Sequence, residues 1–318
     1  VILREVRYTL SRFLGIFAIV ALGVGFLAGL LASTPDMRLT ADAYYDDADM
    51  MDLRVLSTLG LSDDDIAAIR ETEGVAAVMP AYSADVLVEA MDASNVVARI
   101  HSLPLGQLDN TDGSDQNRVS LVSGRMPEEP GECVVLRTKT LSGVEAGDVI
   151  TLSADNSDLT EVLAAPSFTV VGFVETPYYM SIEDESSTIG AGRVQLTLYT
   201  GEESFAYPAW TEAFVLVEGA GALNTFYDEY EDLVGTAQDH IETLAQTQAV
   251  VRYDTIVAEA EDKLAEGQKE YDDAKAEADK ELADALQELE DGRKQLEDCE
   301  KQLADSKQET ADGKQQLE

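Results

Sequence analysis

The pattern of hydrophobic and polar positions opens with one long apolar run. Residues 13–35 (FLGIFAIVALGVGFLAGLLASTP) carry no charged side chain. Because a helix rises about 1.5 Å per residue, this run extends roughly 30 Å or slightly more, enough to cross the hydrocarbon core of a bilayer. Arg4, Arg7 and Arg12 precede the run, and several aspartates follow it. Since positive charge is retained in the cytoplasm, we predict a transmembrane helix at residues 13–34, with the rest of the chain outside.

A cleaved signal peptide is the alternative interpretation of this segment. Its apolar region is ordinarily shorter, however, and the residues Leu30, Leu31 and Ala32 make a poor cleavage site. Ahead of the run, residues 1–12 predict a short amphipathic segment on the cytoplasmic surface, or else the frayed start of the membrane helix.

Small residues share one face of the predicted membrane helix. Ala21, Gly25 and Gly29 are spaced by four residues, which would let a second helix pack closely there. Glycine is also common in membrane helices without any such role, so both interpretations stay open.

Residues 35–248 have the pattern of an extracytoplasmic mixed α/β core domain. A strand near 52–57 is followed by a helix that a Ser62–Asp65 capping box begins and Gly74 ends. Two further strands flank Pro80, and another is expected near 95–102. Later β-branched runs predict strands in the segments RVSLVSG, ECVVLR, GDVITLS, FTVVGFVE, RVQLTLYT and AFVLVE, before a helix from Gly221 to about Leu244.

The last part of the chain, residues 249–318, predicts a coiled-coil stalk. One seam repeats every seven residues at Leu282, Leu289, Leu296 and Leu303, and a second seam holds Ala278, Ala285, Gly292 and Cys299. A helix of this length would reach on the order of 100 Å. The small second-seam residues favour an antiparallel hairpin with a returning segment, and a parallel homodimer is the rival arrangement. The chain ends inside this pattern, so we expect it to be part of a longer protein.

Charge and composition exclude several functions. The net charge of −40 excludes ordinary nucleic-acid binding, because phosphate would be repelled. Only two cysteines and two histidines, His101 and His240, are present, without metal-ligand spacing, so both histidines are expected to be structural. The acidic loop at 105–118 fails the register of a calcium loop. No phosphate loop or nucleophile elbow occurs, so we expect neither catalysis nor a cofactor in this chain.

Four aromatic residues allow one further interpretation. They could line a groove for a ligand, although such residues more often belong to a core. These residues are Tyr178, Tyr179, Tyr207 and Trp210.

Three segments together resemble FtsX/MacB-like permease subunits of ABC transporters, sometimes called type VII. They are the opening REVRYTLSRFLGIFAIVALGVGFLAGL, the segment YYDDADMMDLRVLSTLGLSDDDIAAI, and the run SGRMPEEPGECVV with the later AGDVITL and FTVVGFV. The run contains the family's G-R-x-P-x-x-P-G-E turn, at Gly124, Arg125, Pro127, Pro130, Gly131 and Glu132. The resemblance covers roughly residues 1–245, and the stalk is similar to long-stalked variants of Gram-positive bacteria.

The resemblance implies a non-catalytic, multi-pass permease of the plasma membrane with three further membrane helices. It implies a separate cytoplasmic ATPase that binds ATP and Mg²⁺, and a second permease copy. Movement of the outer domains would export peptides, lipids or antibiotics, or would activate an envelope partner such as a cell-wall hydrolase. The stalk would be the binding surface for such an envelope partner. The alternative function is a single-pass surface sensor or adhesin with the coil as a spacer.

Overall fold

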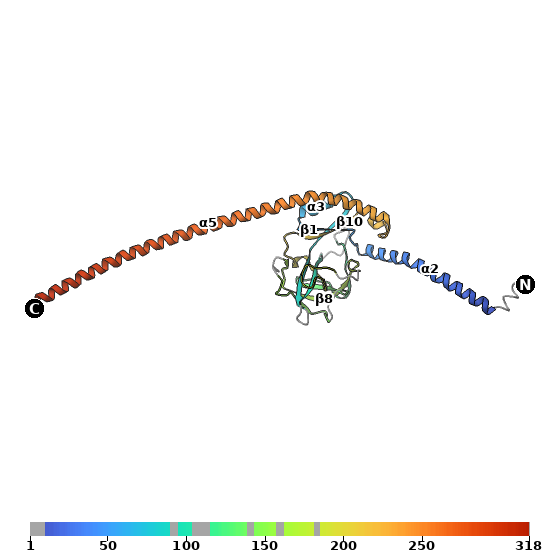
Figure 1. Ribbon diagram of the computed structural model, residues 1–318, viewed down its shortest axis with the longest axis horizontal. Helices are drawn as coiled ribbons and strands as arrows, with labels where there is room; N and C mark the ends of the chain where they lie inside the picture. The colour runs from blue at the N-terminus through green and yellow to red at the C-terminus, as the bar shows by residue number, and fades with distance from the viewer. Residues whose placement is uncertain are drawn as a thin grey trace. The chain divides into compact units, whose positions relative to one another are not determined.

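The computed structural model describes residues 10–89, 95–103, 115–138, 143–156, 162–180 and 185–317, with side chains described up to residue 312 (Figure 1). It divides into two compact units, residues 1–250 and residues 251–318. Most of the predicted amphipathic segment at 1–12 and of the acidic loop at 105–118 lies outside the described residues.

The first element, α2 (Leu10–Asp47), is longer than the membrane span predicted at 13–34. It is the one helix in the described residues that is long and apolar enough to cross a membrane, and none of its residues is buried. Pro35 lies inside it, where the missing N–H removes a single helical hydrogen bond. The helix continues to Asp47, beyond the apolar run, and its last turns contact the folded core.

A three-stranded antiparallel sheet has the order β1 (Leu53–Leu61), β10 (Trp210–Val217), β2 (Val75–Ala81). One face packs against α3 (Asp63–Arg70) and the first part of α5 (Asp228–Leu317), as Figure 1 shows. The predicted capping box begins α3: the Asp65 N–H donates to the Ser62 hydroxyl, and the Ser62 N–H donates to the Asp65 carboxylate. Ile66 and Ile69 of α3 are thereby directed into the core.

A seven-stranded mixed sheet forms the larger part of the core. Its main path is β3 (Ser83–Glu89), β4 (Asn95–Leu103), β9 (Leu196–Gly201), β6 (Glu132–Leu136), β8 (Ser167–Glu175), β5 (Ser120–Gly124), with β7 (Val149–Thr151) paired to β8. The β4–β9 and β6–β8 pairs are parallel. Three short 3-10 helices complete the described elements: η1 (Pro177–Tyr179), η2 (Glu202–Ser204) and η3 (Ala220–Ala222).

The predicted α+β class is confirmed: an apolar N-terminal helix, a mixed α/β core and a long C-terminal helix. Two predicted helix boundaries are wrong. The helix after Ser62 ends at Arg70 rather than near Glu73. The helix placed from Gly221 begins only at Asp228, because η3 and a turn occupy the preceding residues and Gly219 has a φ of +83°. This turn contacts α2, as described below.

Within the second unit, residues 251–317 continue α5 as one uninterrupted helix. The leucine seam is exposed on it: Leu282 by 62%, Leu289 by 71%, Leu296 by 62% and Leu303 by 56%. An isolated helix cannot bury such a stripe, which agrees with the predicted need for a partner. The coiled coil itself, hairpin or parallel pair, stays a prediction.

Candidate functional site

The end of α2 is held by the connection that precedes β5. The N–H groups of Asn117 and Arg118 donate to the carbonyls of Asp49 (3.0 Å) and Ala48 (2.9 Å). The Arg118 guanidinium also donates to the Asp47 carbonyl (2.8 Å) and pairs with the Asp49 carboxylate (2.9 Å). Asp49 and Asn117 adopt positive φ, a conformation that these two residue types tolerate better than most. Arg118 therefore caps the Asp47 carbonyl at the end of α2, and the backbone of residues 117 and 118 holds the two residues that follow the helix.

Two aspartates connect the same region to the start of α5. Asp42 in α2 accepts hydrogen bonds from the N–H and the hydroxyl of Thr225, both at 2.7 Å. Asp52, just before β1, accepts from the Val217 N–H at 2.7 Å and from the Tyr230 hydroxyl at 2.6 Å. We call Asp42, Asp52, Thr225 and Tyr230, together with Asn117 and Arg118, the joint.

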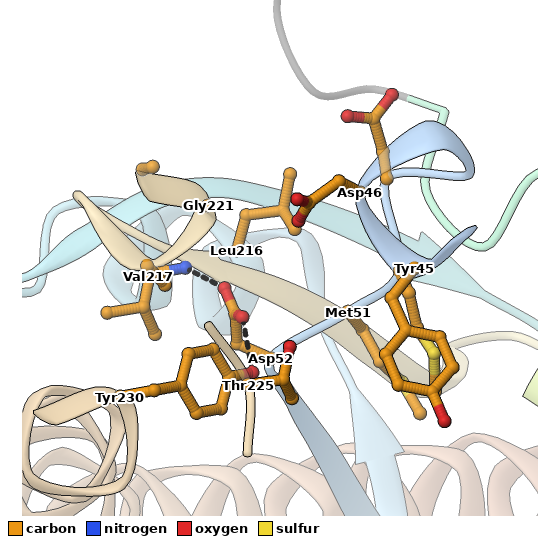
Figure 2. A pocket seen from close by; sticks show the side chains of 13 residues that line it. Tyr45, Asp46, Met51, Asp52, Leu216, Val217, Gly221, Thr225 and Tyr230 are labelled. Carbon is orange, nitrogen blue, oxygen red and sulfur yellow. Dashed lines mark hydrogen bonds between the residues drawn. The ribbon is translucent and has the colours of Figure 1, made fainter. Parts of the chain in front are cut away.

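A cavity of about 540 Å³ lies at the joint. Figure 2 shows Asp52 between Val217 and Tyr230, with Tyr45 and Asp46 of α2 at the other side. Burial raises the pKa of the Asp52 carboxyl, while its bonds from Tyr230 and Val217 oppose that change. Both Asp52 oxygens are engaged, and the described residues hold no group of three side chains suited to a metal ion. The arrangement is suited to holding elements together.

The family-motif turn connects β5 to β6. Arg125 forms a two-pronged ion pair with the Glu132 carboxylate, which also accepts from the N–H groups of Glu128 (3.0 Å) and Glu129 (3.3 Å). Gly124 and Gly131 both have a φ of +83°. Pro127 is buried and Pro130 is exposed. The motif closes its own turn and lies apart from the joint's hydrogen bonds.

The Glu132 contacts predict an acid-sensitive turn. Hydrogen bonds from Arg125 and from the Glu128 N–H lower the pKa of the Glu132 carboxyl to about 2. A lowered pKa stabilises the fold above the ordinary carboxyl range of about 4.5, and this contribution is lost as pH falls towards 2. We expect Glu132→Gln to flatten the acid side of the stability curve between those values, measured by Trp210 fluorescence during urea unfolding. An unchanged curve would contradict this role for the carboxylate.

A buried charge cluster joins the two sheets. The Glu212 side chain on β10 is fully buried, and it accepts a hydrogen bond from Nε of Arg54 on β1 at 2.6 Å. Its other oxygen lies 3.5 Å from Nδ1 of His101 on β4, whose Nε2 bonds the Tyr179 hydroxyl. Burial pushes the pKa of the Glu212 carboxyl upward, but the contacts with His101 and Arg54 outweigh it and hold this pKa below its ordinary value.

The four aromatic residues do not form one groove. Tyr178 and Tyr179 surround His101, with ring centroids 5.9 and 5.8 Å from the imidazole. Tyr207 and Trp210 instead stack on Tyr82, at 6.3 and 4.5 Å. Tyr82 is the residue between β2 and β3, so the second cluster packs where the chain passes from one sheet to the other.

The remaining predicted residues lie on open surfaces or in structural contacts. Ala21, Gly25 and Gly29 are exposed on α2, and a Cβ added at either glycine would meet no atom of the described chain within 4 Å. A packing partner for this face stays a prediction. His240 bonds the Glu73 carbonyl through Nδ1 at 3.0 Å.

Sequence reasoning missed the joint. Asp42 and Asp52 belong to an acidic stretch in which no single carboxylate stands out, and their partners Thr225 and Tyr230 are 183 and 178 residues away. The available signal was the position of Thr225 just before a helix whose first turn contains Tyr230, which by itself does not identify a partner.

The fold and the joint define a mixed α/β domain attached to a helix that is long and apolar enough to cross a membrane. The sequence matches no protein-family model and no curated protein. Solved structures similar to the chain include an extracellular domain of an ABC-type transporter, a periplasmic region of MacB and a domain of a permease protein.

Three of these structures are representative. The extracellular domain of the noncanonic ABC-type transporter YknZ from Gram-positive bacteria has 8% identity, covering 61% of this chain and 87% of that one, with a TM-score of 0.33. The periplasmic region of MacB from Actinobacillus actinomycetemcomitans has 12% identity over 61% and 84%, with a TM-score of 0.30. A domain from Porphyromonas gingivalis described as part of a permease protein has 15% identity over 57% and 78%, with a TM-score of 0.27.

Proposed function

We propose that this chain is the permease subunit of an ABC transporter of the FtsX/MacB-like type. It contributes no catalytic group. A separate cytoplasmic ATPase binds and hydrolyses ATP with Mg²⁺, a second permease copy completes the membrane part, and the full protein crosses the plasma membrane several times. The chain converts movement of its membrane helices into movement of its outer domain and stalk.

The observation that carries this proposal is the joint. The end of α2 is bonded through Asp42 to the turn before α5, and Asp52 links the start of β1 to β10 and to Tyr230 in the first turn of α5. Hydrogen bonds to charged groups contribute about 1.5–3 kcal/mol each. Because two carboxylates accept four such bonds, a displacement of the helix end is passed to the core and to α5 before the joint separates.

The three sequence segments that resemble the permease family indicate the class of protein, a permease subunit. The transported or activated partner is an envelope molecule: a peptide, lipid or antibiotic for export, or a cell-wall hydrolase bound through the stalk. The exposed leucine seam of α5 gives the stalk a face for a returning arm or a partner. A simple surface adhesin would not require a bonded connection between its anchor and its spacer.

Labelling on intact cells tests the topology. We expect a membrane-impermeant maleimide to label Lys301→Cys in a Cys299→Ser background, because position 301 is exposed and lies off the leucine seam. The other thiol, Cys133, is buried, and burial raises its pKa to about 12, so it serves as the silent internal control. If Lys301→Cys reacts only after lysis, the stalk is cytoplasmic and the proposal is wrong.

A joint variant tests the coupling. The full-length protein would be placed in nanodiscs with its partner ATPase. The distance between spin labels on the α2 end and on the core-packed part of α5 would be followed on ATP addition. We expect Tyr230→Phe, which removes one hydrogen bond to Asp52, to broaden the distribution of this distance. The same variant should weaken transport-linked activity roughly tenfold while ATP hydrolysis continues.

The matched control is Tyr227→Phe, since Tyr227 is 48% exposed. It should behave as the unmodified protein. If the two variants have equal effects, the hydrogen bonds of the joint do not couple the membrane helix to the outer domain. An ATPase that neither assembles with the chain nor changes its rate would favour the sensor or adhesin function instead.

A further inference from the structure

A second cavity, separate from the joint cavity, lies between the two sheets. Its volume is about 290 Å³. Met79 and Phe214 come from the three-stranded sheet, while Leu121 and His101 come from the seven-stranded sheet. We call it the inter-sheet cavity. Any molecule inside it would contact both sheets at once.

The walls of the inter-sheet cavity are mainly apolar and aromatic. Met79, Leu121 and Met126 supply flexible apolar surface, and Tyr178 packs edge-on against Phe214 with ring centroids 6.0 Å apart. Methionine and aromatic side chains make favourable contacts with a ring placed between them. An apolar cavity of about 150 Å³ accommodates benzene. The inter-sheet cavity therefore has room for one ring with a short substituent.

Asn117 supplies a polar end to this cavity. The Met51 N–H donates to its side-chain oxygen at 3.0 Å, which fixes the orientation of the amide. The amide nitrogen has no hydrogen-bond partner among the described residues, although Asn117 is only 9% exposed. Its φ of +54° is uncommon for a residue other than glycine. A buried N–H without a partner costs free energy that a ligand oxygen would recover.

We propose that the inter-sheet cavity binds a compact neutral ligand: one aromatic or similarly sized apolar ring that carries a carbonyl oxygen. The ring lies among Met79, Met126, Tyr178 and Phe214. The carbonyl oxygen lies at the Asn117 end and accepts from the side-chain amide.

Such a ligand would also restrict movement at the joint, and the importance of this effect rests on the proposed function. Asn117 and Arg118 line the inter-sheet cavity, and their backbone N–H groups hold the carbonyls of Asp49 and Ala48 at the end of α2. A bound ligand would therefore restrict the segment that holds the membrane helix. The ligand would act as a regulator or as a substrate recognised outside the membrane.

Binding can be measured without the ATPase, so its failure is distinct from failure of the permease function. The probe is benzamide, added to the full chain in nanodiscs and followed by saturation-transfer NMR against empty nanodiscs. We expect saturable binding of benzamide. Aniline keeps the ring but is a poor hydrogen-bond acceptor, so it should bind roughly tenfold more weakly. Acetamide, which lacks the ring, should not bind.

Two neighbouring variants locate the site. Leu121→Trp should fill the cavity mouth and abolish benzamide binding, whereas Val122→Trp, on the next residue of β5 and not lining the cavity, should leave it unchanged. Urea unfolding followed by circular dichroism reports whether each variant is folded, because the added tryptophan would obscure the Trp210 signal. Met126→Trp replaces Leu121→Trp if the latter unfolds. The proposal is overturned if benzamide does not bind, if aniline binds equally well, or if the folded cavity variants and Val122→Trp behave alike.

Discussion

Replacing Glu212 by alanine is expected to lower the free energy of unfolding by about 3 kcal/mol, the lower end of the range for breaking a buried ion pair. The lower end applies because the Arg54 side chain is 30% exposed and can recover some hydration, whereas the Glu212 side chain is fully buried. The loss also removes the contact between His101 and the three-stranded sheet. Chemical unfolding followed by Trp210, the single tryptophan of the chain, measures the change.

Two controls separate lost charge pairing from lost volume. Glu212→Gln keeps the size and an acceptor, and it should recover part of the stability. The pair Arg54→Met with Glu212→Leu replaces both charges by apolar side chains, and it should recover most of it, because well-packed apolar pairs often equal buried ion pairs in stability. If Glu212→Ala and the double variant are equally unstable, the cause is packing rather than an unpaired charge.

Replacing Gly124 by alanine is expected to destabilise the core by about 2–5 kcal/mol, combining a left-handed backbone with steric overlap. At the φ of +83° an added Cβ would overlap the carbonyl oxygen of Val171 and approach the Cα of Gly172 to 2.6 Å. Both atoms belong to the β8 backbone, so no side chain can move to make room. The same unfolding measurement with Trp210 fluorescence gives the value.

Gly131 provides the matched control within the same turn. Its φ is also +83°, but the nearest atom to an added Cβ would be the Ser167 carbonyl oxygen, at 4.0 Å. Gly131→Ala should therefore show only the backbone cost, about 1–2 kcal/mol. Similar losses for the two variants would mean that the close approach of β5 to β8 is not what requires glycine at Gly124.

Local patterns predicted most of the fold because the local chemistry was decisive. The alternation in FTVVGFVE reappears as strict alternation of buried and half-buried residues along β8. The Ser62–Asp65 spacing gave the start of α3, since both capping bonds form within four residues. The seven-residue leucine repeat gave a helix that continues to Leu317, although a repeat does not identify what covers it.

The joint and the charge cluster could not be predicted in this way. Arg54 and Glu212 are 158 residues apart, and Glu212 stands in a β-branched run where its burial is not apparent from sequence. The late start of α5 likewise accompanies η3 and the bond from Thr225 to Asp42, a contact between distant segments that the local helical pattern does not indicate. Side chains whose partners are set by topology require the folded chain to be recognised.

β10 connects the buried ion pair between the two sheets to the joint. Glu212 lies near its beginning, in the ion pair between the sheets, and Val217 ends it with its N–H on Asp52. Five residues of strand separate these positions by roughly 17 Å. β1 and β2 pair with β10 along its two edges. A displacement at the end of α2 would thus have a short route through hydrogen-bonded backbone to the centre of the domain.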